Sequence, residues 1–388
     1  MTIKYKIDHD YIVRMRREIH EYPELGWDLP KTSALVKREL EAMGIEYTEE
    51  YGECSVVGII NPQSTGRTIG IRADMDALPV DEVNELEFKS KVPGKMHACG
   101  HDAHTAILLG TAKALSEIRD QLSCRVKLIF QPCEEGPELG GALMVEKGVM
   151  KDVDVVIAQH VDTSLHTGEI GIVPGNAMAS ARRFIVEFFG KTTHGTLPHK
   201  GINALAMAVR AYDGINQMQV MEIDPFAEKI CTIGSFHSGF AANVLPDYAM
   251  FTGTIRTYDT ELDQFIFSRI QTIAQNAAEE LGGTCKVTSP RFTRHMYNDP
   301  EVSDEVIQSA GSVVGSENVK ILTKKMGSDD FSFFAAEKKG ALFRLGIKNE
   351  EKGCITPVHT NTFCLDEDAL KIGTAVFVQY VIDHMEMK

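Results

Sequence analysis

The chain has 388 residues, of which 40 are Lys or Arg and 55 are Asp or Glu, giving a formal net charge of −15. Charged residues make up 24% and apolar residues 43%, a composition typical of globular proteins. The acidic balance argues against nucleic acid or an anionic membrane as a partner, because no basic surface is available to hold phosphate groups. The length predicts two or three domains.

The first twenty residues mix charges throughout and lack the apolar segment and small-residue cleavage site of a secretory signal. The longest segment without Asp, Glu, Lys or Arg is residues 230–246, whose Gly, Ser, Asn and His are not typical of a membrane span. Eight widely spaced cysteines indicate reduced thiols rather than a disulfide framework. These observations predict a soluble, cytoplasmic protein.

The first 175 residues alternate helical periodicity with short apolar runs. The expected helices are 9–22, 31–43, 102–118 and 139–148, and the expected strands are 55–60, 68–73, 126–131 and 153–159. Near-continuous apolar strands that alternate with helices are typical of a mainly parallel α/β sheet covered on both faces.

The character of the sequence changes after Gly175. The expected order is strand 182–190, helix 202–218, strands 229–236 and 248–258, a long helix capped by Asp259, and strand 284–288. This βαββαβ order predicts a ferredoxin-like α+β unit of roughly 110 residues.

From about residue 293 the α/β pattern returns. The expected helices are near 301–314, 328–337 and 366–383, and the expected strand is 340–345. We therefore expect one discontinuous α/β domain, built from residues 1–180 and 291–388, with an α+β domain inserted at 181–290.

The segment 96–104, MHACGHDAH, is the densest cluster of functional groups in the sequence. Cys99 and His101 are separated by one glycine, and thiolate and imidazole are ligands for metals such as zinc. The same residues are also compatible with a buried cysteine beside a helix N-capping Asp102.

Two acidic residues, Glu134 and Glu135, follow the expected strand 126–131, where open α/β sheets place their ligands. One carboxylate can bind metal while its neighbour takes a proton from a metal-activated water. The alternative is a solvated acidic pair in a loop.

Further candidates stand at comparable positions. His160 ends the apolar run 153–159, and His359 lies in a loop before the final helix. Asp74 and Asp76 follow the strand 68–73, where they could orient a ligand imidazole or simply form a capped turn before Pro79. A single sheet edge that collected these side chains would be a metal site.

Several blocks of sequence together resemble a known family. They are RADMDALP (72–79), MHACGHDAH (96–104), FQPCEEG (130–136), NVLPD (243–247), GTIR (253–256) and MGSDDF (326–331). The chain resembles, from end to end, the amidohydrolase branch of the dinuclear-metal exopeptidases, which includes aminoacylases, hippurate hydrolases, indoleacetyl-amino-acid hydrolases and N-acetyldiaminopimelate deacetylases. The resemblance implies an α/β zinc-exopeptidase-like catalytic domain that carries the inserted ferredoxin-like domain as a lid.

The resemblance also implies which residues act in the catalytic domain. The ligands of two divalent metal ions per subunit would be Cys99, His101, Glu135, His160 and His359. Glu134 would be the general base and acid. Asp74, Asp76 and Asp102 are candidates to orient the ligand side chains without binding the metal ions themselves. Zinc, manganese, cobalt and nickel are all compatible with this donor set.

In the lid, the resemblance assigns three residues to the substrate. His194 would help to polarise the scissile carbonyl, while Asn243 and Arg256 would hold the free carboxylate, which an arginine can bind bidentately. Their ordinary alternatives are a surface histidine, a turn asparagine and a strand-end ion pair. The lid is also expected to join subunits into a homodimer or homotetramer.

The expected function is metal-dependent hydrolysis of the amide bond of N-acyl amino acids, such as N-acetyl or N-benzoyl derivatives. Two alternatives remain: a dipeptidase acting on short peptides, and a homologue that binds without turnover. Gln159, Asp162 and Thr193 depart from the residues usual in the family and are positioned to reshape the substrate pocket.

Overall fold

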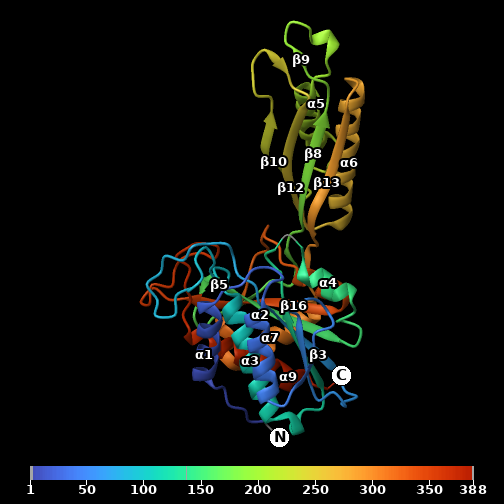
Figure 1. Ribbon diagram of the computed structural model, residues 1–388. Coiled ribbons are helices and arrows are strands. Elements are labelled where there is room, and N and C mark those ends of the chain that lie inside the picture. The colour runs from blue at the N-terminus through green and yellow to red at the C-terminus, as the bar shows by residue number, and fades with distance from the viewer. Residues whose placement is uncertain (1–2, 137, 387–388) are drawn as a thin grey trace. The chain divides into compact units, whose positions relative to one another are not determined.

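A computed structural model describes residues 3–136 and 138–386. The chain divides into two compact units (Figure 1). The first unit contains the described residues up to 177 together with 297–324 and those from 329 onward, and the second contains 178–296 and 325–328. The expected insertion, 181–290, therefore falls within the second unit.

The first unit is organised around an eight-stranded sheet with the order β1-β2-β4-β3-β5-β16-β6-β15. Its strands are β1 (Glu46–Thr48), β2 (Val56–Ile60), β3 (Thr68–Asp74), β4 (Arg125–Gln131), β5 (Val155–His166), β6 (Ile170–Ile172), β15 (Val319–Ile321) and β16 (Lys339–Lys348). The central strands β4, β3, β5 and β16 are parallel, whereas β1, β2 and the β16–β6 pairing are antiparallel. The expected α/β fold with a mainly parallel sheet is confirmed.

Helices cover both faces of this sheet, as the apolar strands require. They are α1 (His9–Glu21), α2 (Pro30–Ala42), α3 (His101–Glu117), α4 (Gly140–Glu146), α7 (Pro300–Val314), α8 (Phe331–Glu337) and α9 (Asp368–His384). On β16, Phe343 packs against Phe377 of α9, while Gly340, on the opposite face, lies against Ala335 of α8. Strand β3 is consequently buried along its whole length.

The second unit has a four-stranded antiparallel sheet with the order β10-β12-β8-β13 (Figure 1). Its main elements are β8 (Ala181–Phe189), α5 (Ala204–Met221), β10 (Lys229–Ser238), β12 (Tyr248–Thr257), α6 (Thr260–Glu280) and β13 (Thr284–Thr293). Both helices pack on the sheet around Phe184, Phe188 and Phe251. Asp259 caps α6 by accepting the N–H groups of Glu261 and Leu262. The observed βαββαβ order and strand order match a ferredoxin-like unit.

The remaining elements are short, and none of them was predicted. The strands are β7 (Gly175–Met178), β9 (Thr193–His194), β11 (Val244–Leu245) and β14 (Met296–Asn298), and one-turn 3₁₀ helices cover Arg119–Gln121, Pro198–Lys200 and Ser316–Asn318. Among the residues that the structure describes, no helix combines the length and apolar character needed to cross a bilayer.

One predicted strand boundary is wrong. His160 does not end its strand, because β5 continues to His166. The polar Gln159 and Asp162 hide this continuation in the sequence, but β16 keeps pairing with β5 through Arg344↔His160 and Gly346↔Asp162. Strand β3 ends at Asp74, two residues beyond its Arg72↔Ala158 pairing with β5, so His160 still lies level with the carboxyl end of the central strands.

Candidate metal centre and active site

Cys99 and His101 flank Gly100, the N-cap of helix α3, and His101 is the first residue of the helix. Gly100 caps the helix with a left-handed φ of +84°, a conformation that favours glycine. A Cβ atom at Gly100 would lie 2.6 Å from Cγ2 of Val161 on β5, which is too close for any side chain. The glycine therefore lets the helix start against the strand that carries His160.

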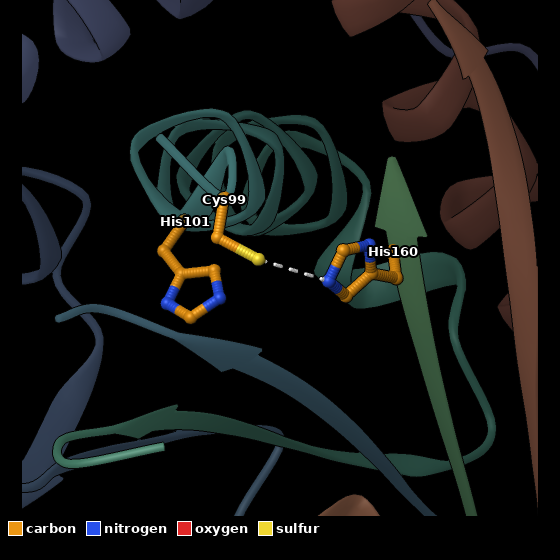
Figure 2. A group of neighbouring side chains, drawn as sticks. All are labelled: Cys99, His101 and His160. Carbon is orange, nitrogen blue, oxygen red and sulfur yellow. Dashed lines mark hydrogen bonds between the residues drawn. The ribbon is translucent and has the colours of Figure 1, made fainter. Parts of the chain in front are cut away.

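The side chains of Cys99, His101 and His160 converge at this point (Figure 2). The Cys99 thiol points toward the His160 ring, with Sγ 3.4 Å from Nε2. His160 is fixed on its other side, where Nδ1 lies 2.7 Å from the carbonyl of Val161. The three potential ligand atoms lie within 4.8 Å of one another.

Glu135 and His359 form a second group with Cys99, again within 4.8 Å. Nε2 of His359 lies 3.1 Å from Oε1 of Glu135. His359 adopts a left-handed φ of +64°, uncommon for a residue with a side chain, and its N–H donates to the Ala98 carbonyl at 2.7 Å. The loop before α9 is thus attached directly beside Cys99.

Glu134 is buried, with 9% of its surface exposed, and stands beside Glu135 and His101. Burial and the negative charge of Glu135 raise the pKa of Glu134 well above its usual range. Its backbone and that of Glu135 are held by Asp76, whose two carboxylate oxygens accept their N–H groups at 2.9 and 3.0 Å. The solvated acidic pair considered from the sequence does not describe Glu134.

Asp74, at the end of β3, contacts His104, for which no role was predicted from the sequence. Nδ1 of His104 lies 2.6 Å from Oδ1 of Asp74, and Nε2 accepts the Val161 N–H at 3.0 Å. These bonds assign the proton to Nδ1 and occupy both ring nitrogens. The signal for His104 was its place one turn after His101 in MHACGHDAH.

Arg72 connects Asp74 to the opposite side of the site. Its guanidinium is buried, 2.6 Å from Asp74 and 2.8 Å from Asp330, and also donates to Gln131. Although burial opposes ionisation, Arg72 holds the pKa of Asp74 well below its usual range. Arg72, Gln131 and Asp330 were not predicted, because residues 72 and 330 are far apart in the sequence.

Asp102 lies within the first turn of α3 and is not its N-cap, so the alternative reading of this residue was wrong. Its carboxylate accepts bonds from Arg16 at 2.9 Å and from Nδ1 of His20 at 2.8 Å. These partners on α1 hold the pKa of Asp102 below its usual range against the effect of burial. Asp102 therefore anchors the start of α3, where His101 is carried.

The donor set fits a transition-metal centre. Thiol, imidazole and carboxylate groups are the ligands of zinc and similar ions. Among the described residues, neither ring nitrogen of the buried His101 makes a well-formed hydrogen bond: Nδ1 lies 3.5 Å from Asp76 and Nε2 lies 3.8 Å from Asp74, so both nitrogens can still bind another group. The two groups that share Cys99 offer places for two neighbouring ions.

His194, Asn243 and Arg256 all lie in the second unit. His194 on β9 pairs with Val244 of β11, and the adjacent Gly195 donates its N–H to the Asn243 carbonyl, so His194 and Asn243 are neighbours. Arg256 on β12 is half-buried and donates to the Met326 carbonyl at 2.7 Å. This bond replaces the strand-end ion pair considered from the sequence.

Comparisons with known proteins agree with this architecture. The profile of peptidase family M20/M25/M40 matches residues 70–383. Thermostable carboxypeptidase 1 of Saccharolobus solfataricus is 42% identical over 94% of this chain and 93% of its own length. An N-acyl-L-amino acid amidohydrolase of Geobacillus stearothermophilus is 39% identical over 70% of this chain and 74% of its own.

A solved structure extends the similarity to the whole chain. The Bacillus subtilis YXEP protein, a dinuclear metal binding peptidase of family M20, superimposes with a TM-score of 0.79 and 29% identity, covering 97% of this chain and 98% of its own. Fold, sequence and relatives define a hydrolase of amide bonds. The chain belongs to peptidase family M20/M25/M40, in which its relatives include amidohydrolases and carboxypeptidases.

Proposed function

We propose that this hydrolase cleaves the amide bond of N-acyl amino acids with two divalent metal ions. The observation that carries the proposal is the convergence of five potential ligands around the buried Glu134: Cys99, His101, Glu135, His160 and His359. The relative from Geobacillus stearothermophilus, an N-acyl-L-amino acid amidohydrolase, supports this substrate class. The dinuclear metal binding peptidase of Bacillus subtilis supports the pair of ions.

The metal ions, when bound, supply a Lewis acid that polarises the amide carbonyl and acidifies water. Glu134 accepts the proton of the attacking water and then delivers it to the leaving nitrogen. Burial suits Glu134 to this exchange, because it raises the pKa of its carboxyl group well above the usual range of a glutamate. Asp76 fixes the backbone of Glu134, and Asp74 fixes His104, which holds the strand backbone at Val161.

The second unit supplies the remaining groups in this proposal. His194 stabilises the developing oxyanion by donating a hydrogen bond. Asn243 and Arg256 bind the free carboxylate of the amino acid, for which the planar guanidinium is suited. The second unit also joins two or more copies of the chain.

A carboxypeptidase activity on short peptides is the second candidate, and the Saccharolobus solfataricus carboxypeptidase favours it. Both substrates present a free carboxylate next to the scissile amide, so the same residues would bind either. They differ on the other side of the amide, where a peptide brings an amino group or further residues and an N-acyl amino acid brings an uncharged acyl group.

The deciding experiment compares Glu134→Gln with the exposed control Glu138→Gln on protein reconstituted with zinc, manganese, cobalt or nickel. N-acetyl and N-benzoyl amino acids are assayed beside dipeptides and longer peptides. We expect faster turnover of the acyl amino acids, unchanged metal content in both variants, and a loss of about 10² to 10⁴ fold in kcat for Glu134→Gln alone. Near-normal turnover by Glu134→Gln would contradict the assignment, and faster cleavage of peptides would favour the second candidate.

A further inference from the structure

Two cysteines, Cys354 and Cys364, flank the loop that carries His359. Within this loop, Oγ1 of Thr356 donates to the Thr362 carbonyl at 2.8 Å. At its tip, the backbone bond from His359 to Ala98 attaches the loop beside Cys99. The loop is thus joined across its base by a side-chain bond and attached at its tip by a backbone bond.

Both thiols lie against the turn formed by residues 349–354. Cys354 is buried and pairs with Asn349 through reciprocal backbone bonds of 2.9 and 3.0 Å. Sγ of Cys354 lies 3.8 Å from the Lys352 carbonyl, and Sγ of Cys364 lies 3.5 Å from the Gly353 carbonyl. The two thiols are close enough for each to shift the pKa of the other, and both are free in the structure.

This contact makes the thiols chemically unequal. The hydrogen bond from Cys354 lowers the pKa of Cys364 to about 7, against the opposing effect of burial. A thiolate at neutral pH is the nucleophile in thiol oxidation, and Cys364 is only partly buried. Cys99, by contrast, is buried, and burial raises the pKa of its thiol.

We propose that Cys354 and Cys364 are a redox pair that a peroxide converts into a disulfide, fastening the base of the His359 loop. The Cys364 thiolate attacks a peroxide oxygen, forming an S–O bond while the O–O bond breaks and one water is released after protonation. Cys354 then attacks the Cys364 sulfur, forming the S–S bond and releasing a second water that carries the remaining proton. With hydrogen peroxide, two thiols lose two electrons and two protons, and the peroxide becomes two waters.

The disulfide closes the segment 354–364 covalently and so reduces the conformations open to the loop. Because Sγ of Cys364 already lies against the carbonyl of Gly353, the residue next to Cys354, closure keeps the backbone near its present path. His359 is then held against Glu135 more persistently. The effect on metal retention rests on the proposed function, since it requires His359 to be a ligand.

The first experiment maps the bond. Full-length protein, as purified, is treated with a few equivalents of hydrogen peroxide, alkylated, digested without reductant and examined by mass spectrometry. We expect a cross-linked peptide joining Cys354 to Cys364 that dithiothreitol separates. Cys364→Ser should abolish it, whereas Cys285→Ser, which changes a partly buried thiol elsewhere, should leave it intact. Both thiols alkylated, or Cys364 oxidised to sulfinic acid without the cross-link, would overturn the proposal.

The second experiment measures hydrogen exchange over residues 355–363. Exchange should slow by about tenfold in the oxidised protein and stay unchanged by peroxide in the Cys354→Ser/Cys364→Ser variant. Equal exchange in oxidised and reduced protein would overturn the fastening role. Zinc release to a chelator is followed in parallel: slower exchange without any bound zinc would contradict the proposed metal site but not the redox pair.

Discussion

Asp76 holds Glu134 through its backbone: Oδ1 of Asp76 accepts the Glu134 N–H at 2.9 Å, while its other oxygen accepts the N–H of Glu135. The same Oδ1 atom lies 3.5 Å from Nδ1 of His101. One buried carboxylate thus sets the relative positions of the proposed base and two proposed ligands. This arrangement explains why an acidic residue stands two positions after the end of β3.

Asp76→Ala should therefore damage both stability and catalysis. Two buried N–H groups would lose their acceptor, which costs about 1 to 3 kcal/mol for each unsatisfied group. Misplacement of Glu134 should lower kcat by about 10² fold. Urea unfolding and steady-state kinetics measure the two effects, with the exposed Glu85→Ala as the matched control. Wild-type kcat in Asp76→Ala would show that Glu134 does not depend on this support.

Cys99→Ser should reduce bound metal, because Cys99 belongs to both potential ligand groups. A serine hydroxyl is a poor replacement for a thiolate ligand of zinc, so we expect affinity to fall by more than about tenfold. Metal content after dialysis against buffered zinc gives the measurement. Cys285→Ser should keep the wild-type content, and unchanged content in Cys99→Ser would exclude the thiol as a ligand.

Arg72→Met tests the buried ion network. Removing the guanidinium leaves Asp74 and Asp330 without their shared partner, and breaking such a buried pair costs about 3 to 5 kcal/mol. Arg38→Met removes an exposed arginine that contacts Glu18 and Glu39, and should cost less than about 1 kcal/mol. The comparison uses unfolding by urea at pH 7. Similar losses in both variants would contradict the special role of Arg72.

His97 predicts a specific pH dependence of stability. Burial lowers the pKa of His97 to about 3, and its ring lies near that of His20 and the charges of Asp102 and Arg16. The unfolded chain binds a proton at this residue near pH 6.5, whereas the folded chain does not until about pH 3. The stability that the folded state gains from keeping His97 neutral is therefore complete above pH 6.5. It is lost as the pH falls from 6.5 toward 3.

Between pH 6.5 and pH 5, this linkage should remove about 1.5 kcal/mol from the free energy of unfolding. His97→Gln cannot titrate, so its stability should fall by that much less over the same interval. Urea unfolding of metal-free protein at several pH values gives both curves. Parallel curves for the wild type and His97→Gln would show that this histidine is not held neutral.

Much of the fold follows from local sequence signals. Apolar runs identify β2, β3 and β4, whose buried residues are contiguous, and the Asp259 signal identifies the start of α6. The three-residue strands β1, β6 and β15 were not predicted, because they are too short to show an alternating pattern of apolar residues. They form only where a neighbouring strand offers backbone partners.

In the candidate site, too, some residues could be predicted from local sequence and others could not. Its candidate ligands come from recognisable motifs, and the structure brings Cys99, His101 and His160 together. The residues that hold the candidate ligands in place could not be predicted where their partners are distant in the sequence. Arg16 and Asp102 are 86 residues apart, and Arg72 and Asp330 are 258 residues apart. Such bonds depend on how helices and strands pack, and no local pattern records them.

The site requires a residue without a side chain at position 100. The residue lies between two proposed ligands and against the strand that carries a third, so a single missing methyl group sets the spacing of all three. Gly100→Ala would force α3 and β5 apart without altering any donor atom. A related protein could then keep all the proposed metal ligands in its sequence and still fail to form the metal centre. When related sequences are judged for activity, the residue at this position is therefore as important as the ligands.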